Sequence, residues 1–128
     1  MKSRRIGSND SGSISVEAAL ALPLLLAITL GAVDLAVYGN VKTTMDNAAS
    51  EAIRGLSINA LTSADAQSLI LDRMSVWTAS ATSSVSTSGD ELTVTVTVPT
   101  SDIPVAGIIN IFDSRPTLVA SATAVKLD

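Results

Sequence analysis

The chain has 128 residues, which is enough for one domain with a single hydrophobic core. Its 12 acidic residues outnumber its 8 basic ones and give a net charge of -4, which argues against a nucleic-acid partner. Because it contains neither cysteine nor histidine, thiol catalysis, disulfide bonds, Cys/His zinc sites and a histidine base are excluded.

The first element predicted along the chain is a membrane-spanning helix over residues 14–38. This stretch contains only two charged side chains, Glu17 and Asp34. As a helix of about 25 residues it would be about 38 Å long, enough to cross a hydrocarbon core of about 30 Å. The uncharged centre, residues 18–33, measures only about 24 Å. We therefore expect Glu17 to lie at one membrane boundary or to be neutralised by a partner.

Two features orient and shape this helix. Lys2, Arg4 and Arg5 precede it, so the positive-inside rule keeps the N-terminus in the cytoplasm and delivers the chain from about Gly39 onward to the far side. Pro23 removes one backbone hydrogen bond, which predicts a kink that membrane helices tolerate.

The helix is expected to continue past the membrane with an amphipathic pattern, ending near Arg54 and Gly55. A second helix is predicted from Ser63, the candidate N-cap, with Asp65 in its first turn. The apolar face of this second helix comprises Ala66, Leu69, Ile70, Met74 and Trp77.

After residue 80 the hydrophobic period changes to two. Residues 92–98 alternate valine or leucine with threonine, the pattern of a half-buried strand, and a turn at Ser88, Gly89 and Asp90 pairs it with residues 81–87. Pro99 and Pro104 bracket a loop. Residues 105–112 form an apolar segment whose secondary structure the sequence leaves open, and residues 117–127 predict a third strand. We expect an α+β fold in which the amphipathic half of the first helix covers a three-stranded antiparallel meander.

The junction before the apolar run resembles a type IV prepilin cleavage site: a basic leader ends at Gly12, and Glu17 is the fifth residue after it. The resemblance implies that a prepilin peptidase cuts between Gly12 and Ser13. The leader would then be residues 1–12, the assembly helix residues 13–38, and a small periplasmic α+β domain residues 39–128. The new α-amine of Ser13 would lie about one helical turn from Glu17, and a neighbouring subunit's amine could pair with that carboxylate.

Within the pilin superfamily the chain resembles the TadE-like family, through residues 15–26 (SVEAALALPLLL) and Asp34 at the end of the apolar run. The resemblance implies a pseudopilin or minor pilin of a tight-adherence (Flp-type) type IV pilus that serves surface adhesion and biofilm formation. Major pilins of that system are much shorter and carry Glu-Tyr where this chain has Glu17 followed by Ala18, which favours an accessory subunit. Its implied partners are the prepilin peptidase, other pilin subunits, the assembly platform of the bacterial inner membrane and lipid. No enzymatic activity, cofactor or metal is implied.

Some alternatives stay open at this point. The chain would instead be an uncleaved, single-pass membrane anchor for a periplasmic binding or scaffold module if its leader is retained. Glu17 would then be a boundary residue that snorkels or is protonated. Asp34 is either an interfacial carboxylate on the outer side or a contact between subunits.

Overall fold

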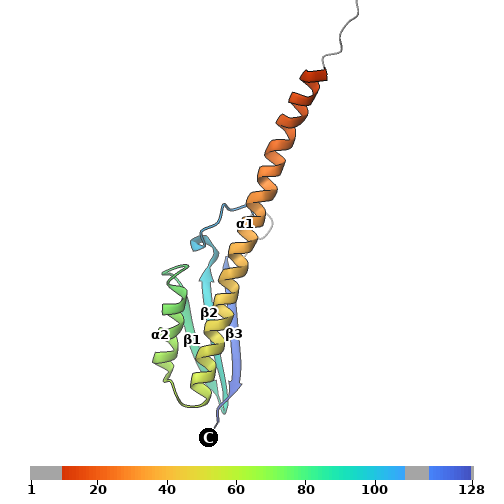
Figure 1. Ribbon diagram of the computed structural model, residues 1–128. Helices are drawn as coiled ribbons and strands as arrows, with labels where there is room; N and C mark the ends of the chain where they lie inside the picture. The colour runs from red at the N-terminus through yellow and green to blue at the C-terminus, as the bar shows by residue number, and fades with distance from the viewer. Residues whose placement is uncertain (1–9, 109–115, 128) are drawn as a thin grey trace, which may run out of the picture.

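The computed structural model describes residues 10–108 and 116–127. Two helices pack on one face of a three-stranded sheet, and the first helix extends far beyond that sheet (Figure 1). This α+β architecture confirms the fold class expected from the sequence.

Helix α1 spans Asp10–Ser57 and continues through Pro23 without interruption. Its predicted end near Arg54 and Gly55 falls slightly short. The residue that adopts a left-handed backbone conformation after the helix is Asn59, with φ of 56°, so Gly55 is not the terminating residue. Gly55 has another role: the carbonyl of Gly55 accepts the backbone N–H groups of Ala60 and Leu61, and the Leu61 side chain lies where a Cβ on Gly55 would stand.

Helix α2 spans Ser63–Met74 and begins one residue away from the expected cap. Thr62, not Ser63, is the N-cap: its hydroxyl accepts the Asp65 backbone N–H at 3.2 Å, and the Asp65 carboxylate accepts the Thr62 backbone N–H at 3.2 Å. This capping box satisfies two N–H groups that would otherwise lack partners. The helix buries Ala66, Ile70 and Met74, as its apolar face predicts.

The sheet is an antiparallel meander in the order β1, β2, β3. Strand β1 spans Thr82–Ser88, β2 spans Glu91–Pro99 and β3 spans Thr117–Val125, each within one or two residues of its predicted bounds. Gly89 makes the β1–β2 turn with φ of 62°, a conformation that glycine adopts without strain. Strand β2 pairs with β3 along its whole length and with β1 from Glu91 to Thr97, which makes it the centre of the sheet.

The core lies between the helices and one face of the sheet. Strand β2 buries alternate residues while the intervening threonines are half-buried. Helix α1 supplies the other side of the core, as the amphipathic pattern predicts, with Val41, Met45, Ala48, Ala49, Ala52, Ile53 and Leu56. Beyond β2 the chain forms a short 3-10 helix, η1, over Thr100–Asp102, followed by a loop whose described part ends at residue 108. The apolar segment 105–112, whose secondary structure the sequence left open, is described only as far as residue 108, and residues 109–112 lie outside the described residues.

Candidate functional site

The N-terminal part of α1, residues 12–30, projects from the domain as a free helical arm (Figure 1). Every residue of this arm is exposed, including its leucine and isoleucine side chains. At 1.5 Å per residue the arm is about 28 Å long, close to the thickness of a bilayer's hydrocarbon core. Within the described residues, α1 is the one helix whose length and composition suit a membrane span. The apolar arm is therefore left uncovered by the part of the chain that the structure describes.

Gly12, Ser13 and Glu17 lie together at the free end of the arm. All three are exposed, and Ser13 and Glu17 are one helical turn apart. In the described part of the chain no side chain pairs with the Glu17 carboxylate. A carboxylate exposed in this way can pair with a group outside the described residues, and the residues outside the described ranges include Lys2, Arg4 and Arg5 of the same chain.

Pro23 lies in the middle of the arm, and the helix assignment continues on both sides of it. Since proline lacks an N–H, the carbonyl of Ala19 receives no intrahelical bond from this position. Small residues accompany it: Ala18, Ala19, Ala21 and Ala27 are exposed along the same stretch. A kink at Pro23 stays a prediction.

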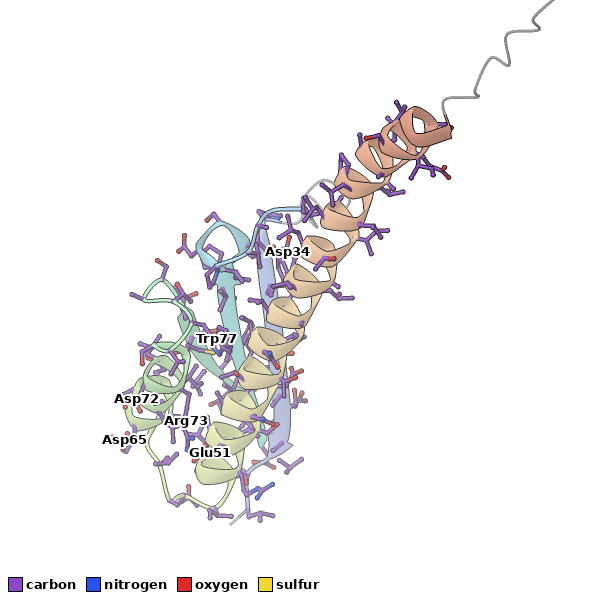
Figure 2. All side chains as sticks on the ribbon, turned by 45° about the horizontal axis from the view of Figure 1, so that its top comes forward. Asp34, Glu51, Asp65, Asp72, Arg73 and Trp77 are labelled. Carbon is purple, nitrogen blue, oxygen red and sulfur yellow. The ribbon has the colours of Figure 1, made fainter. Side chains whose placement is uncertain are left out.

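Asp34 marks the point where the arm joins the domain. Its residue exposure is 0%, and its carboxylate accepts the backbone N–H of Ala106 at 2.6 Å and that of Ile108 at 2.8 Å. We call this arrangement the Asp34 clasp; in Figure 2, Asp34 lies on the side of α1 that faces the loop beyond β2. Ile108 also lies beside Gly31, one turn before Asp34: a Cβ added to this glycine would stand 3.5 Å from Ile108 Cγ2.

The clasp adds to both alternatives for Asp34 a contact within the chain that neither of them includes. The buried carboxylate is hydrogen-bonded within its own chain, so in the monomer it is neither an exposed carboxylate nor one that needs a neighbouring subunit as its partner. With Asp34 withdrawn, the exposed side of α1 carries no charge from Ala18 until Lys42, about 36 Å along the helix. The apolar surface is therefore longer than residues 18–33 alone provide.

A groove lies between α1 and the C-terminal end of α2. Trp77, just past the end of α2, donates its indole N–H to the Thr44 hydroxyl at 3.1 Å, and Arg73 pairs with Glu51 at 3.0 Å (Figure 2). These contacts fasten the two helices together. The side chains that line this groove include no pairing of nucleophile and base, and no group of three or more acidic residues suited to a metal occurs in the described ranges.

A comparison with protein families finds that residues 12–54 match the model of TadE-like proteins. Over this segment the chain is similar to the TadE-like family. The matched segment contains Gly12, Ser13, Glu17, Pro23 and Asp34, and it ends within the part of α1 that packs on the sheet. The TadE-like segment is thus the arm together with most of its amphipathic continuation. Comparisons with curated proteins and with solved structures gave no match.

Proposed function

We propose that this TadE-like chain is a minor pilin or pseudopilin that is held in the bacterial inner membrane by its arm, cleaved there, and assembled into a tight-adherence pilus for surface adhesion and biofilm formation. The family connects the chain to pili as a minor-pilin-like protein. The observation that carries the proposal is the arm itself, a fully exposed apolar helix with one carboxylate near its free end.

The membrane stage rests on length and charge. An exposed apolar surface about 28 Å long has a favourable environment in a bilayer and an unfavourable one in water. The basic residues before the arm keep that end in the cytoplasm, and the domain that follows is then outside the inner membrane. Residues 13–38 form the assembly helix in this proposal, and residues 39–128 form the periplasmic domain.

Processing by a prepilin peptidase at the bond between Gly12 and Ser13 turns the anchored precursor into an assembly-competent subunit. Both residues are exposed at the end of the arm, remote from the packed domain, so a membrane-embedded peptidase can approach them without unfolding the core. The cut creates a positively charged amine one turn from Glu17.

Assembly then proceeds by lateral association of arms. A carboxylate in a hydrocarbon environment is unfavourable by roughly 2.5–3.5 kcal/mol on insertion scales, and a neighbour's Ser13 amine relieves that cost when it pairs with Glu17. The alanines of the arm allow the helices to approach closely, as small residues do in membrane helix pairs.

The processing step is tested by mass spectrometry of the chain extracted from membranes of cells with and without a prepilin peptidase. We expect a species that begins at Ser13 in the first case alone, and Gly12→Val should block its appearance. Gly39→Val is the matched control, since Gly39 is also an exposed helical glycine with open space around it. A chain that keeps residues 1–12 in the presence of the peptidase would favour the uncleaved anchor instead.

The assembly step is tested with Glu17→Gln, which removes the charge and keeps the size. We expect normal cleavage but a loss of pili in cells that carry this variant. Asp46→Asn is the control, because Asp46 is an exposed carboxylate on the same helix whose partner, Lys42, lies within the chain. Normal piliation with Glu17→Gln would contradict the pairing of Glu17 with a neighbour's amine.

A further inference from the structure

The loop over residues 103–108 lies beside α1 at the level of Gly31 and Asp34. It is attached there by the Asp34 clasp, and Ile108 lies beside Gly31. Figure 1 shows this loop at the end of the sheet from which the arm emerges. The loop and the base of the arm therefore form one continuous surface.

The depth of the arm in a bilayer places this surface at the membrane. If Glu17 lies at one boundary, a hydrocarbon core of about 30 Å takes up about 20 helical residues and ends near Val37. Gly31 and Asp34 then lie at or inside the outer boundary. Tyr38, about one turn beyond Asp34, is a residue type enriched at membrane interfaces.

The composition of the loop fits this position. Its sequence, IPVAGI, has no polar side chain, and Pro104 and Ala106 are exposed. The opposite end of the sheet differs, because its exposed residues include Asn59, Asp90, Glu91 and Lys126. Asp102, exposed just before the loop, limits how deeply the loop can enter, which suits the headgroup region.

The backbone of the loop is also prepared for a site with little water. The N–H groups of Ala106 and Ile108 are bonded to Asp34, that of Val105 is bonded to the Ile103 carbonyl at 2.9 Å, and Pro104 has none. Irregular backbone next to lipid is tolerated only where its polar groups are satisfied by the protein. The clasp meets that condition for two of the loop's N–H groups and for the carboxylate at once.

We infer that residues 104–108 of this loop form a second membrane contact, which rests in the lipid headgroup region and fixes the domain against the outer surface of the bilayer. This inference rests on the proposed membrane insertion of the arm. Its partner is the phospholipid interface. Contact of the same residues with another copy of the chain is the competing outcome.

The absence of native cysteine allows a direct test with single-cysteine variants of the full chain in phosphatidylethanolamine and phosphatidylglycerol vesicles. A fluorophore on Ala106→Cys reports on the loop, one on Leu25→Cys on the arm, and one on Ser88→Cys on the far turn, about 26 Å away along β2. Each is quenched separately by lipids with a nitroxide near the headgroup, by lipids with a deep nitroxide, and by aqueous iodide.

We expect the Ala106 label to lose emission with the shallow nitroxide, the Leu25 label with the deep one, and the Ser88 label with iodide only. An Ala106 label that behaves like the Ser88 label, while Leu25 remains in lipid, would overturn the loop contact and leave the membrane arm intact. A Leu25 label exposed to iodide would overturn membrane insertion itself. Lipid quenching at Ala106 that disappears at one chain per vesicle would identify another copy as the partner and refute the inference.

Discussion

Replacing Asp34 with alanine tests the clasp, which is the contact that the structure adds to the TadE-like segment. The substitution removes both acceptors of the Ala106 and Ile108 N–H groups. A hydrogen bond to a charged group contributes about 1.5–3 kcal/mol, so two such bonds set an upper range of about 3–6 kcal/mol. Because Ala106 is exposed and the N–H groups of a released loop regain hydrogen bonds to water, we expect the free energy of opening the loop to fall by about 2–3 kcal/mol.

Amide hydrogen exchange of the full chain in detergent micelles measures this loss locally. A change of about 2–3 kcal/mol in the opening free energy corresponds to exchange about 30- to 150-fold faster at Ala106 and Ile108. Amides of strand β2 should keep their protection, since β2 is paired on both sides. Asp34→Asn should fall between the wild type and Asp34→Ala, because its amide oxygen accepts one N–H while its NH₂ group opposes the other.

The matched control is Asp46→Ala, which removes an exposed carboxylate from the same helix. Its ion pair with Lys42 is an exposed pair of the i,i+4 type, worth about 0.3–0.5 kcal/mol. Unchanged exchange at Ala106 and Ile108 in Asp34→Ala, within about twofold of the wild type, would refute the stabilising role assigned to the clasp.

Two further predictions concern the packed domain. Gly55→Ala should lower the free energy of unfolding by about 1–2 kcal/mol, because the new Cβ overlaps the Leu61 side chain. Gly39→Ala, with open space around the new Cβ, should instead raise the free energy of unfolding by about 0.5–1 kcal/mol. Chemical denaturation compares the two variants, and changes of the same sign in both would contradict the close contact between Gly55 and Leu61. The Thr62 side chain and then its backbone N–H lower the pKa of Asp65 below 3.8. The stabilisation from this carboxylate is therefore complete above pH 3.8 and is lost as the pH falls through the lowered pKa. The free energies of unfolding of the wild type and Asp65→Asn should converge in acid. A constant difference between these free energies at all pH values would refute the stabilising role of the Asp65 carboxylate.

Periodic patterns predicted the parts of the fold that a single face of an element determines. The spacing of Val41, Met45 and Ala52 showed which side of α1 faces the core, and the alternation of valine and threonine did the same for β2. These predictions succeeded because burial of one face repeats with the period of the element. The covering of the sheet by α1 follows from the same property.

The residues at which the helices begin and end were predicted less well, because several neighbouring residues are suited to the same capping position. Thr62 and Ser63 are both good N-caps, and the deciding feature is an acidic residue three positions later, which Asp65 supplies for Thr62. Gly55 and Asn59 both suit a helix end, and the backbone turns left-handed at Asn59 because Gly55 is needed for the approach of Leu61.

The partner of Asp34 could not be predicted from spacing, since the loop it binds lies more than 70 residues away along the chain. The available signal was indirect: a charged residue interrupts an apolar run, and a charge-free loop with Pro104 and Gly107 occurs later in the sequence. Gly107 has φ of 84°, which turns the chain between the two amides that reach the carboxylate. Neither feature alone specifies that the two meet.

Glu17 presents the opposite situation to Asp34, although both are single carboxylates bordering the same apolar stretch. Asp34 obtains its hydrogen bonds from its own chain and is fully buried, so its charge adds no requirement for a neighbour. Glu17 is exposed on a helix that nothing in the described domain covers. Since desolvating a bare carboxylate is unfavourable, the arm can enter a lipid or helical environment at the Asp34 end without a partner, whereas removing Glu17 from water is favourable only if the carboxylate gains one. This asymmetry directs the demand for a second subunit to the end of the arm where cleavage is proposed to create an amine.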